Sequence, residues 1–403
     1  MDRTDRKRLV ALALLAALVA PALAQARPGD LDRSFGDGGK VRTGFCGGYA
    51  SPYSVVTDSR GRIVVGGQNT WSDGLCVDRF RANGTRDPSF GSGGEVKTVL
   101  GAAGGVRAVA IDSHGRIVAA GFGRQSGGHR DFALARYEPN GALDPSFGTG
   151  GTVTTDPGSA EVATSVAIDT GGRIVVLGDD GVTLARYRAN GSLDPSFGTG
   201  GIVTTDFGPR GGANSVAIDS RDRIVAAGFG QRHHRYGFAL ARYNPSSAPD
   251  QSFSGDGKLT TDFGRTAGVY SVAIDSRDRI VAAGFGKRHH RYGFALARYA
   301  RSGRLDAAFS RDGKVITSFK GPTSATSVAI DSRGRIVAAG SAWEVARYRR
   351  NGRLDHSFSG NGKVSPGWGS YSSSAAIDPE DRIVEAGAHG SLVLGRFVGY
   401  RRR

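Results

Sequence analysis

The chain has 403 residues and carries 53 Lys and Arg against 37 Asp and Glu, a formal net charge of +16. No apolar run reaches the roughly 18 residues that a membrane-spanning helix needs, which argues against a helical membrane protein. The 63 glycines fall at fixed places in a repeat, which favours turns between short strands over low-complexity disorder. The positive balance leaves nucleic acid, an anionic membrane surface or an acidic polysaccharide as candidate partners.

Residues 1–26 are predicted to be a signal peptide. Basic residues near the start precede an apolar run at 9–20, and Pro21 and the A-x-A segment Ala24-Gln25-Ala26 follow. An uncleaved membrane anchor is the alternative, for which the apolar run is short. No Cys stands at the junction to mark a lipoprotein. We therefore expect a mature chain from Arg27 in the periplasm, at the cell surface or in the medium, where nucleic acid is the poorest partner.

Seven repeats fill the rest of the chain, and three landmarks align them. The first landmark is an L-D-x-S-F-like segment with Phe35, Phe90, Phe147, Phe197, Phe253, Phe309 and Phe358. The second is a V-A-I-D-like segment with Asp58, Asp112, Asp169, Asp219, Asp275, Asp331 and Asp378. The third is a F-A-L-A-R-Y-like segment with Arg79, Arg136, Arg186, Arg242, Arg298, Arg347 and Arg396. A period this regular fixes the architecture before any single motif does.

Each repeat predicts four strands, which we call a, b, c and d. In the fourth full repeat they cover 215–219, 223–228, 238–243 and 258–263. The polar turn between a and b has tight-hairpin chemistry. Strand b is apolar on both faces and should be covered on both sides, whereas strand d alternates and suits an outer position.

The two ends of the repeat array complement each other. The mature chain opens with a lone d strand at 39–45 and closes with a lone a–b–c set that ends at 392–397. Together they make one blade, so the chain is predicted to be an all-β, seven-bladed β-propeller over 27–400, closed by its N-terminal strand, with a basic tail at 401–403. A solenoid is the alternative, but it would need distinct capping repeats.

The L-D-x-S-F-G-x-G-G and V-A-I-D-S-x-G-R-I-V-A-A-G motifs resemble the delta-60 repeat family of exported bacterial β-propellers. The a–b hairpin is also similar to that of NHL-type propellers. The resemblance implies the propeller fold over nearly all of the mature chain, and it implies no particular activity. In three repeats Ser254, Ser310 and Ser359 replace the Gly that follows the Phe.

Residues that recur in every repeat are interpreted as structural, because a catalytic group acts at one place. We expect the strand-a aspartates to cap turns and to pair with arginines at the sheet ends. The same reasoning covers the recurrent phenylalanines, as core residues, and the strand-b arginines, Arg62, Arg116, Arg173, Arg223, Arg279, Arg335 and Arg382.

The two cysteines, Cys46 and Cys76, follow the first d strand and begin strand c of the first complete repeat. In a propeller both places lie near the same face, and an exported chain can oxidise them. We predict a disulfide; two free thiols too far apart to pair are the alternative.

The b–c loops differ most between repeats and carry the candidate ligand-binding residues. Two adjacent loops are rich in Arg, Lys and His, and the predicted site is Arg232, His233, His234, Arg235, Lys287, Arg288, His289, His290 and Arg291. Segments 213–243 and 269–299 differ at only three positions, so duplication alone accounts for the second loop, and a solvated basic rim is the alternative. Metal binding is not predicted, because no carboxylate or Cys is spaced with the histidines.

Three functions are compatible with these features. The first is a secreted, monomeric binding or scaffold protein for an anionic polysaccharide, envelope glycan or lipid headgroup, without a cofactor. The second is a lyase or hydrolase at the mouth of the central channel, using non-repeated polar residues among Asp73, His129, Glu161, Asp179, Asp180 and His389. These show no nucleophile–base spacing, so no catalytic residue is assigned and an enzyme is the less favoured hypothesis. The third is a purely structural surface protein.

Overall fold

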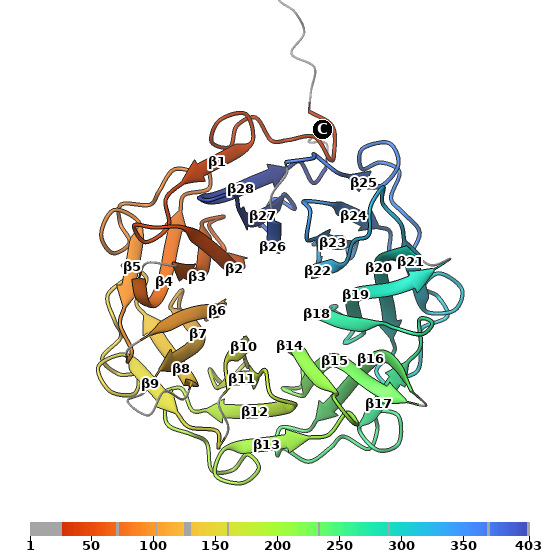
Figure 1. Cartoon of the computed structure of the whole chain (residues 1–403), viewed down its shortest axis with the longest axis horizontal. Helices are drawn as coiled ribbons and strands as arrows, with labels where there is room; N and C mark the ends of the chain where they lie inside the picture. The colour runs from red at the N-terminus through yellow and green to blue at the C-terminus, as the bar shows by residue number, and fades with distance from the viewer. Residues whose placement is uncertain are drawn as a thin grey trace, which may run out of the picture.

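The computed structural model describes residues 26–400 except 70–71, 102, 125–129, 159–160, 233, 289–290 and 369–370. For Ser72, Asp73, Arg124, Arg232 and Arg288 only the backbone is described. The described residues form 28 β-strands in seven four-stranded antiparallel sheets, arranged as blades around an axis (Figure 1). The predicted all-β, seven-bladed propeller is confirmed. Within the described part of the chain, no helix has the length and apolar character needed to cross a bilayer.

Each blade has an inner strand a, two middle strands b and c, and an outer strand d. The inner strands are β2 (Ala50–Thr57), β6 (Gly104–Ile111), β10 (Ala163–Ile168), β14 (Gly212–Ile218), β18 (Gly268–Ile274), β22 (Ala325–Ile330) and β26 (Tyr371–Ile377). The b strands are β3 (Ile63–Asn69), β7 (Ile117–Arg124), β11 (Ile174–Gly178), β15 (Ile224–Arg232), β19 (Ile280–Arg288), β23 (Ile336–Gly340) and β27 (Ile383–Ala388).

The c strands are β4 (Ser72–Phe80), β8 (Arg130–Tyr137), β12 (Val182–Tyr187), β16 (Arg235–Tyr243), β20 (Arg291–Tyr299), β24 (Val345–Tyr348) and β28 (Leu392–Phe397). The d strands are β5 (Glu95–Thr98), β9 (Thr152–Thr155), β13 (Ile202–Thr205), β17 (Lys258–Thr261), β21 (Lys314–Thr317), β25 (Lys363–Val364) and β1 (Lys40–Thr43). Blades 1 to 6 follow chain order from β2, and blade 7 has the order β1-β28-β27-β26.

In five of the seven blades, a serine beside a bulge in strand a joins the inner strand to its neighbour. In β14 the pairing with β15 shifts between Ala213 and Ser215, so Asn214 is left out of register. The Oγ of Ser215 then accepts the amide N–H of Val272 in the next inner strand, at 3.1 Å. The same contact recurs around the axis as Val109–Ser54, Val216–Ser165, Val328–Ser271 and Val55–Ser374. The recurrent Ser of the repeat therefore links blades around the channel.

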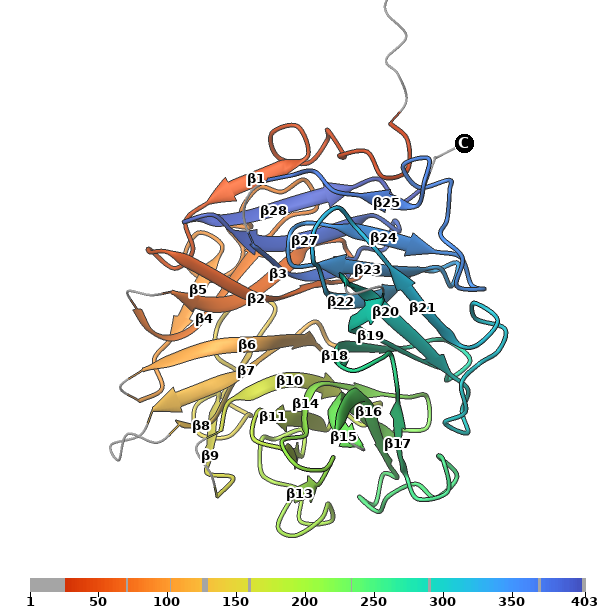
Figure 2. The same cartoon turned by 45° about the vertical axis from the view of Figure 1, so that its right-hand side comes forward.

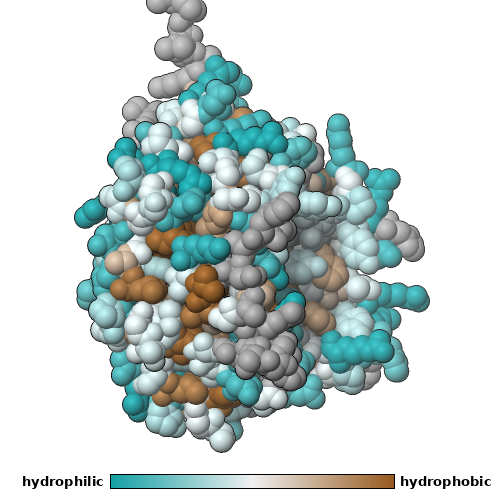
Figure 3. Space-filling view, turned by 60° about the vertical axis from the view of Figure 1, so that its left-hand side comes forward, coloured by the Kyte–Doolittle hydropathy of each residue, from teal (hydrophilic) through white to brown (hydrophobic). Residues whose placement is uncertain are grey.

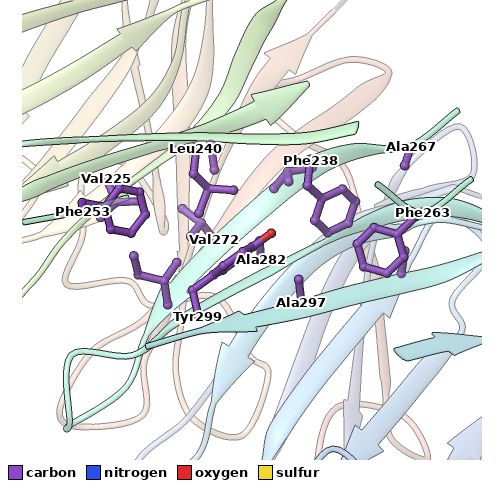
Figure 4. Packing of buried hydrophobic residues seen from close by; sticks show 14 residues of the cluster. Val225, Phe238, Leu240, Phe253, Phe263, Ala267, Val272, Ala282, Ala297 and Tyr299 are labelled. Atoms are coloured by element: carbon purple, nitrogen blue, oxygen red, sulfur yellow. The ribbon is translucent and has the colours of Figure 1, made fainter. Parts of the chain in front are cut away.

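The hydrophobic core lies between blades rather than at the axis. Between blades 4 and 5, Val225 and Leu240 of one sheet pack against Val272, Ala282 and Tyr299 of the next (Figure 4). Small side chains in strand b let the sheets approach closely, which accounts for the Ala and Val in that strand. The seven phenylalanines of the L-D-x-S-F segments are fully buried, as predicted for core residues.

The strand-a aspartates cap the a–b turns, as predicted. In blade 4, Asp219 Oδ1 accepts the amide N–H groups of Arg221 and Arg223, and its Oδ2 accepts Arg223 Nε at 2.7 Å. In the other blades the strand-a aspartate likewise accepts a hydrogen bond from the strand-b arginine. These aspartates are Asp58, Asp112, Asp169, Asp275, Asp331 and Asp378.

The strand-c arginines hold the c–d connections. Arg242 Nε donates to Asp250 Oδ2 at 2.8 Å, and its guanidinium lies 4.5 Å from the ring centre of Phe253. Its Nη1 donates to the carbonyl of Arg301 in the next blade, at 2.6 Å. The carboxylate partner is therefore the Asp of the L-D-x-S-F segment, which the sequence did not assign. The equivalent pairs are Arg79–Asp87, Arg136–Asp144, Arg186–Asp194, Arg298–Asp306, Arg347–Asp355 and Arg396–Asp32.

The N-terminal strand completes blade 7, as predicted. β1 pairs antiparallel with β28, outside it in the blade (Figure 2). It is shorter than the expected 39–45. The carbonyl of Pro28 accepts the amide N–H of Ser359 at 2.7 Å, and Asp32 pairs with Arg396 at 2.9 Å. The chain ends thus meet inside a c–d connection that is continuous in the other blades.

Blade 7 also contains a buried carboxyl group that no other blade has at this place. Glu385 in β27 stands where the other b strands have Ala or Val, and it is fully buried. Neither of its carboxylate oxygens has a hydrogen-bond partner among the residues that the structure describes. Burial raises the pKa of Glu385 well above its ordinary value, and the nearby Glu344 raises it further. A neutral Glu385 is the form that this site favours.

Ring closure predicts the effect of removing the first strand. Deleting residues 27–45 from the mature chain should expose the edge of β28 and leave Arg396 without Asp32. We expect aggregation or a fall in melting temperature of about 10 °C or more, measured by differential scanning calorimetry.

The matched control is a circular permutant of residues 27–400, with Tyr400 joined to Arg27 through a short Gly-Ser linker and new ends between Asn190 and Gly191. This moves the break to an equivalent c–d connection and should melt within a few degrees of the mature chain. A deletion variant as stable as the mature chain would refute the closure.

Glu385 predicts a pH dependence of stability. Because its folded-state pKa lies above the value of about 4.3 in an unfolded chain, the native state holds the proton more tightly, and stability falls as pH rises from about 5 towards 8. Glu385→Gln should raise the melting temperature at pH 8 by about 3 °C while changing it little at pH 5. Glu138→Gln, at a less buried carboxylate, is the control. Equal shifts at both pH values would rule out titration of Glu385.

Candidate binding face

The two faces of the ring have different chemistry. The a–b turns and c–d connections lie on one face, the turn face, and are fixed by the Asp–Arg pairs described above. The b–c hairpins and d–a loops lie on the opposite face, the loop face, which varies from blade to blade. In the space-filling view, hydrophilic side chains project from the molecule with smaller hydrophobic patches between them (Figure 3). Because binding residues lie disproportionately on variable loops, the loop face is the candidate for a specific site.

The two predicted basic loops are the ends of long hairpins. Segments 231–236 and 287–292 were expected to be loops, but the strands continue through them. β15 pairs with β16 as far as Arg232 opposite Arg235, and β19 pairs with β20 as far as Arg288 opposite Arg291. Cross-strand pairs of large side chains, such as Phe229 opposite Phe238, extend the ladder. Both hairpins have longer strands than the b–c hairpins of blades 3 and 6.

The structure describes part of the predicted site. Arg235, Arg291 and His234 are exposed at the hairpin ends, and His234 occupies the turn with a φ of 59°. Lys287 is half-buried, with its Nζ 5.4 Å from the ring centre of Tyr292. Three of the predicted residues, His233, His289 and His290, lie outside the described residues, and Arg232 and Arg288 are described by their backbone alone.

Five aromatic side chains on the two hairpins and on β18 were not predicted as part of the site. We call them the aromatic strip: Phe229, Tyr236, Tyr270, Phe285 and Tyr292. In blade 5 the ring centres of Tyr270 and Phe285 are 5.5 Å apart, and those of Phe285 and Tyr292 are 6.0 Å apart. In blade 4 those of Phe229 and Tyr236 are 6.2 Å apart.

A glycine lets the two halves of the aromatic strip meet. A Cβ on Gly268 would lie 2.9 Å from the ring of Phe285 and 3.3 Å from Cβ of Phe229. The hairpin of blade 4 also contacts the loop that enters blade 5, because the backbone carbonyl of Tyr236 accepts a hydrogen bond from the amide N–H of Ala267 at 3.0 Å. The strip is therefore one surface across two blades.

A groove runs from Lys287 along the outside of the blade 4–5 junction. It has a volume of about 630 Å³, and its lining includes Phe263, Lys287, Arg311 and Lys314 together with the acidic residues Asp262 and Asp312. Lys314 donates through Nζ to the carbonyl of Asp262 at 3.4 Å. Cations and apolar surface thus continue from the strip onto the rim.

Exposed large hydrophobic residues gather on the loop face. The described residues include four, all beside the start of an a strand or the end of a d strand: Tyr49, Val99, Tyr270 and Tyr371. In blades 1 and 2 a different arrangement occurs, because Arg107 lies 3.9 Å from the ring centre of Tyr53 and covers it. Among the side chains that the structure describes, no cation covers Tyr270, which is 41% exposed.

Of the six residues considered for an enzyme, the four whose side chains are described lie in blade 3 and blade 7. The Asp73 side chain and His129 lie outside what is described. Asp179 Oδ1 accepts the amide N–H of Val162 at 2.7 Å, and Glu161 fills the space beside Gly178. Both shape the loop of blade 3. Asp180 is exposed in the same blade, and His389 is exposed in blade 7, where its carbonyl accepts Arg42.

The structure joins Cys46 and Cys76 by a disulfide, with their Cα atoms 6.2 Å apart. Cys46 follows β1 and Cys76 lies in β4, so the bond links the closing strand to blade 1. Its loop spans 30 residues, for which the chain-entropy model gives about 3 kcal/mol of stabilisation.

Comparisons with known proteins were consistent with this fold. The model of a family described as a domain of unknown function (DUF5122) beta-propeller matches residues 61–90, 114–147, 172–197 and 334–358. The recognition of a propeller repeat family is thereby confirmed. No curated protein matches the sequence.

Solved structures match over most of the chain at low identity. Virginiamycin B lyase from Staphylococcus aureus, an inactive variant with quinupristin, has a TM-score of 0.59 and 10% identity, over 89% of this chain and 99% of that one. A structure titled streptogramin B lyase has a TM-score of 0.55 and 8% identity, over 88% and 96%. The WD40 propeller domain of Doa1 has 0.57 and 11%, over 89% and 96%. These likenesses show the fold alone.

The disulfide can be tested on protein purified without reductant. Trypsin cleavage without reduction should release peptides 43–60 and 63–79 as one linked species in a mass spectrum, and reduction should separate them. Reduction should also lower the free energy of unfolding by about 3 kcal/mol. Stoichiometric alkylation of both thiols in unreduced native protein would contradict the bond.

Proposed function

We propose that this chain, which carries repeats of the DUF5122 β-propeller family, is an exported binding protein that holds an anionic ligand on its loop face. One observation carries the proposal. Two adjacent hairpins, β15–β16 and β19–β20, extend beyond their neighbours and carry the cations Arg235, Lys287 and Arg291 at or near their ends.

Arginine suits this role because its charge does not titrate and its planar donors match carboxylate and phosphate groups. The strand-b and strand-c arginines of the turn face differ, since each is paired with an aspartate of its own blade. Arg235 and Arg291 are exposed instead, on the face where the chain varies. The predicted signal peptide would place this surface outside the cytoplasm, where carboxylated and phosphorylated glycans and lipid headgroups share the chemistry that these side chains recognise.

The charge requirement can be tested with polygalacturonate, polyphosphate and phosphatidylglycerol vesicles as probes at low salt. We expect at least one to bind, and we expect added salt to weaken binding. The triple variant Arg235→Ala, Lys287→Ala, Arg291→Ala should weaken it about 30-fold, since each exposed ion pair contributes up to about 1 kcal/mol. Isothermal titration calorimetry gives the affinities.

The matched control is the triple variant Arg60→Ala, Arg221→Ala, Arg277→Ala, which removes three exposed cations from the turn face. It should change affinity little. Replacing the histidines of the two hairpins by Gln should reduce a strengthening of binding from pH 7.5 to pH 5.5, because imidazole gains charge near and below its ordinary pKa of about 6.5. These histidines are His233, His234, His289 and His290. Equal losses from both triple variants, or no binding to any probe, would refute the proposed site.

A further inference from the structure

We propose that the ligand is an acidic polysaccharide, whose sugar rings stack on the aromatic strip while its carboxylates meet Arg235, Lys287 and Arg291. This inference rests on the proposed function and narrows it to one class of ligand. It draws on the geometry of the strip and on the differences between the two copied hairpins.

The first observation is the shape of the strip in blade 5. Tyr270, Phe285 and Tyr292 come from the adjacent strands β18, β19 and β20, so three rings lie in a row across the sheet. Tyr270 is the bulge residue of its strand, where the register shifts between Val269 and Ser271. The bulge releases the side chain from the inter-blade packing and presents it at the channel side of the loop face.

The rings do not match the chemistry of a simple anion. A phosphate group or polyphosphate chain has no apolar surface to cover an aromatic ring, so it would use the cations and leave the rings in water. A pyranose ring has apolar C–H faces that can cover a flat side chain, with hydroxyls at its edge that bond to water or to the phenol of a tyrosine. Aromatic rings beside exposed cations therefore match a sugar that carries carboxylates.

The second observation is where the duplicated segments differ. Segments 213–243 and 269–299 are identical except at three positions. Asn214 corresponds to Tyr270, and Gln231 corresponds to Lys287. One difference adds an exposed ring to blade 5 and the other adds a cation next to Tyr292. Two of the three differences thus place the two kinds of contact that an acidic sugar needs in the same blade.

The third difference provides a control. Ala213 corresponds to Val269, which is fully buried in the core between blades 4 and 5. Replacing each residue of blade 5 by its counterpart in blade 4 gives three variants, Tyr270→Asn, Lys287→Gln and Val269→Ala. The same strand already accommodates the replacement residues in blade 4, so Tyr270→Asn and Lys287→Gln should fold as the parent does.

The experiment measures the affinity of the mature chain and these variants for four probes at low salt. The probes are polygalacturonate, the same polymer fully methyl-esterified, inorganic polyphosphate, and phosphatidylglycerol vesicles. We expect polygalacturonate to bind most tightly and its uncharged ester to bind at least tenfold more weakly. Tyr270→Asn should weaken polygalacturonate binding about tenfold and leave polyphosphate binding unchanged, whereas Lys287→Gln should weaken both. Val269→Ala should affect neither.

The outcomes separate this inference from the proposed function. Two results would refute the assignment of an acidic polysaccharide but leave the proposed anion-binding function intact. The first is tighter binding of polyphosphate or vesicles than of polygalacturonate, and the second is unchanged polygalacturonate binding in Tyr270→Asn. If Val269→Ala weakens binding as much as Tyr270→Asn, the ring acts through packing and the inference also fails. If no polyanion binds, or the methyl ester binds as tightly as the acid, the proposed function fails with it.

Discussion

The ring depends on the buried arginine of strand c. In each blade this guanidinium bonds the aspartate of its own c–d connection, covers the phenylalanine of the same segment, and donates to a carbonyl of the next blade. A buried guanidinium loses its hydration, and this cost is offset only when its ion pair and its hydrogen bonds are all formed. Burial lowers the pKa of Arg347 to about 10, with Arg335 adding to the effect and Asp355 opposing it. Burial alone would raise the pKa of Asp144, but Ser146 and Arg136 lower it to about 2.

This arrangement explains why closure and blade packing are coupled. Arg396 lies in the last strand of the sequence, yet its carboxylate partner is Asp32, which precedes β1, and its carbonyl partner is Ala82 of blade 1. An open ring would leave that guanidinium buried without its acceptors. The disulfide reinforces the same junction from the loop face. With the turn face fixed in this way, the b–c hairpins can vary in length and charge without loss of the core.

Much of the fold could be predicted because the same four-strand repeat occurs seven times in the sequence. The period, the hairpin residues and the incomplete ends gave the blade count and the closing strand. The aspartate partner of the strand-c arginine was missed, although an aspartate follows this arginine eight residues later in each of blades 1 to 6. Glu385 could have been found by aligning the b strands, where it stands alone among Ala and Val.

Of the candidate site, only the basic residues were predicted from the sequence. Its aromatic half depends on a bulge that redirects Tyr270 and on Gly268, which lets Phe229 and Phe285 approach across two blades. Neither follows from the sequence of one repeat, because both arise from packing between repeats. The extension of β15–β16 and β19–β20 was missed because Gly, Arg and His were interpreted as loop residues, whereas cross-strand pairs of aromatic side chains keep the ladder intact.

The central claim is that the loop face of blades 4 and 5 is where this propeller holds its ligand. Hydrogen exchange of the mature chain, measured by mass spectrometry with and without saturating polygalacturonate, tests it most directly. Slower exchange should be confined to peptides covering the ends of the two long hairpins and the start of β18, where backbone amides open most readily. Protection located on the turn face, or on the loop face of blades 1 and 2, would contradict the account.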